Sequence, residues 1–159
     1  MLAGELLRLW AVRHIGVVSR TRSDRLGPLV SSGPFGHVRN PLYVGNIALW
    51  VGFAVAARLV WLAPVIGLLL GAAYHAIVSW EETLLESRLG EGYRAYAARV
   101  PRWIPSLRSS KARPVTPSLS SRTFSWSDTL FSERGTLIAI GSGVMLLWLK
   151  SRLGLTAHF

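Results

Sequence analysis

Residues 59–80 form a stretch of 22 positions without a charged side chain. A helix rises about 1.5 Å per residue, so a stretch of this length is enough to cross the roughly 30 Å hydrocarbon core of a bilayer. The composition agrees, because half of the 159 residues are hydrophobic and only 16% are charged, against about 25% in ordinary soluble domains. We therefore predict an all-α, integral membrane helical protein.

A second uncharged stretch precedes the first. Residues 44–57 cover only 14 positions, which is too short to span a bilayer alone. Arg58 separates the two stretches, and an arginine at a hairpin tip can extend its guanidinium to the lipid headgroups. Asn40 is disfavoured in a helix because it precedes Pro41, whereas proline suits the first turn of a helix. The pattern predicts a transmembrane helix hairpin over residues 41–80.

Basic residues gather on both sides of this hairpin. Six arginines occur up to and including Arg39, and nine lysines or arginines lie between Glu81 and Arg134, against one at the tip. Lysine and arginine accumulate on the cytoplasmic side of short loops, so we expect both feet of the hairpin to face the cytoplasm. No run of basic residues interleaved with aromatics occurs, which argues against a nucleic-acid partner. Membrane lipids are the expected partners.

The segments outside the hairpin differ in composition. Residues 1–18 carry apolar side chains at spacings of three and four, which predicts an amphipathic interfacial helix. Residues 135–149 are uncharged, a marginal length for a span, so crossing the membrane and lying outside it both stay open. We divide the chain into a membrane domain (1–105, with a cytoplasmic segment over 81–105), a Ser-, Pro- and Arg-rich linker (106–134) and an apolar tail helix (135–159).

The content of cysteine and histidine bears on metal and redox chemistry. The chain has no cysteine, which excludes disulfides, thiolate metal sites and a cysteine nucleophile. The four histidines, His14, His37, His75 and His158, never occur at the spacing of helical metal ligands. We therefore expect no metal site. His75 lies inside the long apolar stretch, where we expect it to hydrogen-bond a neighbouring helix.

Two groups of polar and aromatic residues flank the hairpin and would meet at its feet. The first is GPFGHVRNPLYVGN at residues 33–46, and the second begins at Glu81 and Glu82 and ends with VPRWIP at residues 100–105. The pattern resembles the isoprenylcysteine carboxyl methyltransferase and phospholipid methyltransferase superfamily. That superfamily has Arg, then His or Asn, Pro, any residue and Tyr at a helix start, followed by a Glu-Glu pair, Tyr and Val-Pro-Arg. The resemblance covers residues 8–105.

The resemblance implies SAM-dependent methyl transfer to a membrane-embedded or lipophilic substrate, with S-adenosyl-L-methionine as the cofactor. A prenylcysteine carboxylate is one acceptor of this kind, and a phospholipid amine is the alternative. Two other hypotheses stay open. One is a truncated, catalytically silent membrane protein, because family members usually carry further transmembrane helices before the matched segment. The other is a membrane reductase that uses a nicotinamide cofactor. A homo-oligomer also stays open.

Several residues have both a site role and a structural alternative. Arg39 could bind a carboxylate through its guanidinium fork, or anchor the chain at the interface. Asn40 could bind the cofactor or cap the following helix, and Tyr43 could face the site or join an aromatic belt. The resemblance implies that Glu81 or Glu82 binds the cofactor's ammonium, against a solvated helical turn as the alternative. The expected catalytic residues are Arg39, Tyr43 and Arg102, and the expected cofactor-binding residues are His37, Asn40, Pro41, Tyr43, Glu81, Glu82 and Tyr93.

Overall fold

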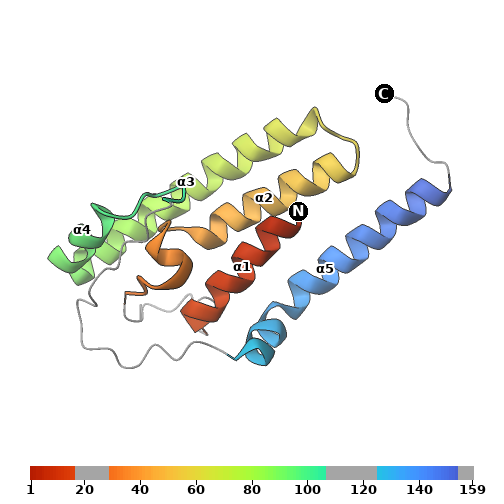
Figure 1. Cartoon of the computed structure of the whole chain (residues 1–159). Coiled ribbons are helices and arrows are strands. Elements are labelled where there is room, and N and C mark those ends of the chain that lie inside the picture. The colour runs from red at the N-terminus through yellow and green to blue at the C-terminus, as the bar shows by residue number, and fades with distance from the viewer. Residues whose placement is uncertain (17–28, 107–124, 154–159) are drawn as a thin grey trace.

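The computed structural model describes residues 1–16, 29–106 and 125–153, and this part of the chain is helical with no strand. Figure 1 shows α1, α2 and α3 side by side, with α5 on the far side of α1 and α4 at the end of α3. The predicted all-α membrane fold is confirmed. The elements are α1 (Leu2–Ile15), the 3-10 turn η2 (Gly33–Gly36), α2 (Pro41–Ala56), α3 (Leu62–Leu89), α4 (Glu91–Ala97) and α5 (Trp126–Arg152).

Helices α2 and α3 form the hairpin that the two uncharged stretches predict. Helix α2 begins at Pro41, directly after Asn40. Arg58 lies in the turn with a φ of 64°, a left-handed conformation that is uncommon outside glycine. Helix α3 does not end at the first charged residue but continues to Leu89. Glu81 and Glu82 are therefore inside a helix, two turns before its end.

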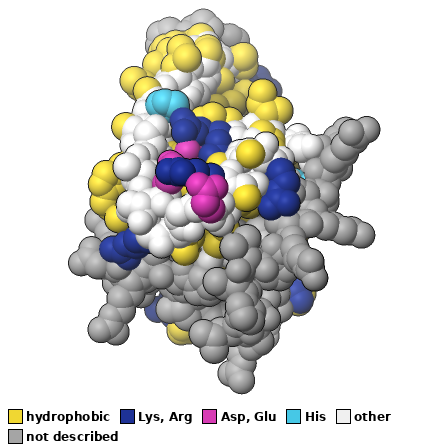
Figure 2. All heavy atoms as spheres, turned by 90° about the vertical axis from the view of Figure 1, so that its left-hand side faces the viewer, with side chains coloured by type: hydrophobic (Ala, Val, Ile, Leu, Met, Phe, Trp, Pro, Cys, Tyr) yellow, Lys and Arg dark blue, Asp and Glu magenta, His cyan; other side chains and the backbone are white. Residues whose placement is uncertain are grey.

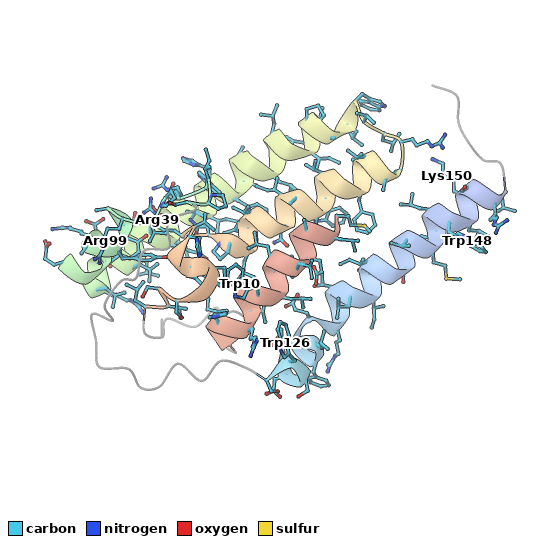
Figure 3. The ribbon with its side chains drawn as sticks, viewed as in Figure 1. Trp10, Arg39, Arg99, Trp126, Trp148 and Lys150 are labelled. Atoms are coloured by element: carbon cyan, nitrogen blue, oxygen red, sulfur yellow. The ribbon has the colours of Figure 1, made fainter. Side chains whose placement is uncertain are left out.

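Two helices are long and apolar enough to cross a membrane, α3 and α5, whereas α2 is shorter with 16 residues. Exposed tryptophans flank the apolar part of each long helix: Trp61 directly before α3 and Trp80 within it, and Trp126 and Trp148 on α5. Figure 3 shows Trp126 and Trp148 at opposite ends of α5. At about 1.5 Å per residue these pairs are separated by roughly 28 and 33 Å along the helices, which matches the spacing of aromatic belts.

Helix α1 packs along α2, whereas the sequence pattern was interpreted as a helix lying at the membrane surface. A Cβ atom at Gly4 would lie 2.6 Å from the carbonyl oxygen of Gly45 and 2.7 Å from the amide nitrogen of Leu49. The missing side chains therefore let the two backbones touch, as small residues do between membrane helices. Ala11 and Val12 on α1 are also buried.

Replacing Gly4 by alanine should separate α1 from α2. The added methyl group meets backbone atoms, which cannot rotate away, so we expect a loss of about 1–3 kcal/mol in unfolding free energy. Gly141→Ala is the matched control, because a Cβ at Gly141 meets nothing within 4 Å; alanine should be neutral there or stabilise the helix by up to about 1 kcal/mol. Thermal unfolding in detergent tests this, and equal melting temperatures for the two variants would contradict it.

A small core at the foot of the hairpin holds α4 in place. Tyr93, Tyr96 and Val100 are buried together, with Leu29, Leu85, Leu89 and Ala97 packed around them. The Tyr96 hydroxyl donates a hydrogen bond of 2.8 Å to the carbonyl oxygen of Phe35. Burial raises the pKa of Tyr96, so the hydroxyl stays protonated and this hydrogen bond persists at neutral pH. The core therefore holds α4 against the η2 turn that precedes α2.

Candidate functional site

Residues 101–106, which we call the strap, lie across the segment that precedes α2. Backbone and side-chain hydrogen bonds join the two segments, although more than 60 residues separate them in the sequence. The strap therefore places the Val-Pro-Arg motif against the Arg-Asn-Pro motif. The bonds are Arg39 N to Pro101 O (2.9 Å), Asn40 Nδ2 to Arg102 O (3.3 Å), Ser106 N to His37 O (2.9 Å) and His37 Nδ1 with Ser106 O (2.8 Å).

Glu82 lies between two arginines from different segments. Its Oε1 is 3.2 Å from Nη1 of Arg39, and its Oε2 accepts a hydrogen bond of 2.5 Å from Nη2 of Arg102. Glu82 is only 9% exposed, so this is not the solvated turn considered from the sequence. Figure 2, which views this end of the molecule, shows acidic and basic side chains together, with hydrophobic side chains around and above them.

Glu81 has a separate partner. The Tyr43 hydroxyl donates a hydrogen bond of 2.9 Å to Oε1 of Glu81, which joins α2 to α3. The ring of Tyr43 packs on Tyr74 with 4.8 Å between centroids. Tyr43 therefore points between the helices toward Glu81, not outward as a residue of an aromatic belt would. The two glutamates are thus held by different groups, one by a phenol and one by guanidiniums.

Tyr93 lies close to Glu82, Arg39 and Arg102 and is 4% exposed. Burial raises the pKa of Tyr93, and the carboxylate of Glu82 raises it further, while a hydrogen bond with Arg39 acts in the opposite direction. A neutral phenol is therefore kept beside the Arg39–Glu82 pair at neutral pH. Tyr93 is also in ring contact with Tyr96, and its expected role in cofactor binding stays a prediction.

The remaining residues expected at the site have structural contacts. The Asn40 side chain makes no capping bond to α2 and instead binds the strap. Pro41 is fully buried at the first position of α2. His37 bonds the strap at Ser106, and its ring lies 6.1 Å from that of Trp10. These three residues position the strap and the helix start, and their described contacts do not include the glutamates.

Arg102 differs in its contacts from Arg94 and Arg99, the two arginines that are close to it in sequence. Arg94 pairs with Glu86 and Glu91 at the exposed surface. Arg99 donates to the Ala95 carbonyl oxygen within its own turn, and Figure 3 places it toward the α4 end of the molecule. Of these arginines, only Arg102 has a described contact with Glu82.

A groove of about 460 Å³ opens between α2 and α3 next to the strap. Its size is within the roughly 300–1,000 Å³ typical of small-molecule sites. Trp103, which sequence reasoning did not assign to the site, lines the groove and stacks on His75 with 6.4 Å between ring centroids. The sequence signal that could have assigned Trp103 to the site is its position directly after Arg102. The other lining residues are Val44, Ile47, Ala48, Val51 and Gly71.

The site has the charges to bind a zwitterion. Arg39 and Arg102 suit a carboxylate, while Glu81 and Glu82 suit an ammonium. Two buried polar atoms, Nε of Arg39 and Oε1 of Glu82, make no hydrogen bond with the described residues, and Oε1 has only its ion-pair contact with Nη1 of Arg39. Buried polar groups of this kind are usually satisfied, so a ligand with both charges fits what the side chains leave open.

The described residues do not form a site that could bind a metal ion. In the ranges 1–16, 29–106 and 125–153, no three His, Asp or Glu side chains are grouped so that they could hold a metal ion. His158, the last of the four histidines, lies outside these ranges.

Comparison with known proteins gives a family and two relatives. The family model described as phospholipid methyltransferase matches residues 1–92, more than half of the chain. A nickel-cobalt-cadmium resistance protein of Alcaligenes xylosoxydans xylosoxydans is 32% identical over 100 residues, and a cobalt-zinc-cadmium resistance protein of Cupriavidus metallidurans is 30% identical over 100 residues. Each match covers 63% of this chain but only 44% and 43% of the relatives, so the chain spans less than half of their length. No solved structure matches the chain.

Proposed function

The chain belongs to the phospholipid methyltransferase family, and we propose that it transfers a methyl group from S-adenosyl-L-methionine to a lipophilic acceptor. The observation that carries this proposal is the buried Glu82 between Arg39 and Arg102, together with an apolar groove that is lined by Trp103, the residue after Arg102. A polar cofactor and a lipid-soluble acceptor need such neighbouring environments. The family match supports methyltransferase activity in general, and the residues support the choice of cofactor.

The charged cluster would hold the amino-acid part of the cofactor. Arg39 and Arg102 would bind its carboxylate through planar, charge-assisted hydrogen bonds. Glu82, which already lies within 3.2 Å of Arg39 and 2.5 Å of Arg102, would bind its ammonium. The Tyr93 phenol would lie beside these charged groups as a neutral hydrogen-bonding group. In this arrangement the cofactor's carboxylate and ammonium would replace part of the ion pairing between Glu82 and the two arginines.

The reaction itself mainly requires alignment. When bound, the cofactor would supply an electrophilic methyl group on its sulfonium for transfer to the acceptor oxygen or nitrogen, with the remaining thioether as the leaving group. A carboxylate acceptor can attack directly, whereas an ammonium must first lose a proton. Glu81, held by Tyr43 at 2.9 Å, is the carboxylate placed to receive that proton. The residues would therefore act mainly by holding both partners in line, since the methyl group passes directly from sulfur to the acceptor.

The orientation follows from the basic residues at the feet of the hairpin. The Glu82 cluster and the strap lie at the same end of the molecule as Arg39, Arg94 and Arg99 (Figure 3), and Arg102 is part of the strap. Since basic residues favour the cytoplasmic side, we place the active site there, where the cofactor is available. The groove between α2 and α3 would receive the acceptor from the bilayer.

Transfer of a radiolabelled methyl group tests the proposal. Purified protein in lipid nanodiscs would be incubated with labelled cofactor and either a farnesylated cysteine or phosphatidylethanolamine, the latter favoured by the description of the family. A methyl ester on a carboxylate releases methanol in alkali, whereas an N-methyl group is stable, so the product identifies the acceptor atom. Cofactor binding without transfer to either lipid would favour the catalytically silent alternative, and absence of binding by folded protein would overturn the proposal.

A further inference from the structure

His75 is a polar side chain placed where α3 faces the membrane. It lies in the middle of a candidate span, is exposed, and lines the groove between α2 and α3. The described residues give it a ring contact with Trp103 but no hydrogen bond, so the expected bond to a neighbouring helix is absent among them. An imidazole without a hydrogen-bond partner is costly in apolar surroundings. Its position therefore calls for a partner that enters the groove.

The place of His75 along α3 fixes where that partner must be. His75 precedes Glu82 by seven residues, so both lie on the same helix face, about 10 Å apart along the axis. The strap contacts α3 at both of these positions, because Arg102 contacts Glu82 and the next residue, Trp103, contacts His75. An acceptor whose nitrogen lies at Glu81, next to this cluster, and that extends along the groove would pass the imidazole after roughly 9 Å along α3.

We infer that His75 is a specificity-determining residue that donates a hydrogen bond to an ester carbonyl of an acyl-lipid acceptor. The inference rests on the proposed function and deepens it by naming the acceptor class. In a glycerophospholipid, the headgroup amine is followed by the phosphate and the glycerol, and the ester carbonyls come next, at a distance comparable to the roughly 9 Å along α3 between Glu81 and His75. In a prenylated cysteine the carbonyl groups are all next to the reacting carboxylate, and the rest is a hydrocarbon chain.

A pair of lipids that differ only in this carbonyl isolates the contact. Phosphatidylethanolamine with ester-linked chains would be compared with its dialkyl ether analogue in nanodiscs, and methyl transfer measured as kcat/KM for each. One hydrogen bond in this setting changes such a ratio by roughly three- to ten-fold. We expect the wild-type protein to favour the ester lipid by this factor, mainly through KM, and His75→Phe to treat both lipids alike. His75→Gln, which keeps a donor, should restore part of the preference.

Two further variants separate this inference from the proposed function. Ile77→Phe adds an aromatic ring to the exposed surface of the same helix and should keep the ester preference. Gly71→Leu places a side chain in the groove, where a Cβ meets no other atom within 4 Å, and should stop transfer to both lipids without changing calorimetric binding of the cofactor. If the wild type transfers methyl groups equally to both lipids, or His75→Phe keeps the preference, the inference fails while the proposed function stands. Absence of cofactor binding by the wild type would instead remove the proposed function.

Discussion

Glu82→Gln should weaken binding of S-adenosyl-L-methionine by about 10- to 100-fold while leaving the protein folded. The substitution keeps the size of the side chain but removes the negative charge between Arg39 and Arg102. The cofactor's ammonium would lose a charge-assisted hydrogen bond of about 1.5–3 kcal/mol, and each 1.4 kcal/mol is tenfold in affinity. Isothermal calorimetry in detergent at fixed ionic strength measures this directly.

The control for this variant is Glu86→Gln on the same helix. Glu86 also pairs with an arginine, Arg94, but both side chains are largely exposed, and such pairs contribute about 0–1 kcal/mol. We expect cofactor affinity in Glu86→Gln to equal that of the wild type. Thermal unfolding would be recorded for both variants. A folded Glu82→Gln protein with wild-type affinity would show that Glu82 serves only to hold the two arginines together.

The sequence allowed the hairpin and the meeting of its two motifs to be predicted, because both follow from local signals. Uncharged stretches, the Asn40–Pro41 pair and Arg58 mark the bounds of α2 and the turn that follows it. The end of α3 was not found, because a charged residue marks the edge of the apolar stretch and not the end of the helix. Residues 81–89 contain good helix formers, and the helix stops at Gly90, which has a φ of 53°.

Contacts between helices could not be predicted in the same way. An amphipathic period is the same whether its apolar side faces lipid or another helix, so the packing of α1 on α2 through Gly4 and Gly45 had no distinct signature. The part of the candidate site formed by Arg39, Tyr43, Glu82 and Arg102 followed from the order of the motifs, and its function stays a prediction. Trp103 and the groove required knowledge of how the strap crosses α2 and α3.

A buried polar network joins α5 to the rest of the molecule, and its residues are far apart in the sequence. Arg8 on α1 contacts Glu5 at 3.2 Å and Glu133 on α5 at 2.5 Å, and it also donates to the side-chain oxygen of Asn46 on α2. The side chains of Arg8, Glu5 and Glu133 are at most 12% exposed. One guanidinium therefore lies against two carboxylates in a place where charges are poorly solvated, and it joins α1 to both α2 and α5.

Arg8→Met should lower the unfolding free energy by about 3–5 kcal/mol, the usual cost of leaving a buried charge without its partner. Methionine keeps the apolar part of the side chain, so the loss would report the charge and not a cavity. Arg94→Met is the matched control, because its ion pairs are exposed and worth about 0–1 kcal/mol. Thermal or denaturant unfolding in detergent, followed by circular dichroism, compares the two variants.

The cause of the loss can be tested by removing the charges that Arg8 neutralises. If uncompensated carboxylates destabilise Arg8→Met, then adding Glu5→Gln and Glu133→Gln should recover a large part of the stability, because amides are far cheaper to bury than anions. If the triple variant is as unstable as Arg8→Met, the arginine acts instead through its geometry, as the donor that holds α1, α2 and α5 together. Equal stability of Arg8→Met and Arg94→Met would show that α5 does not depend on this network for its place beside α1.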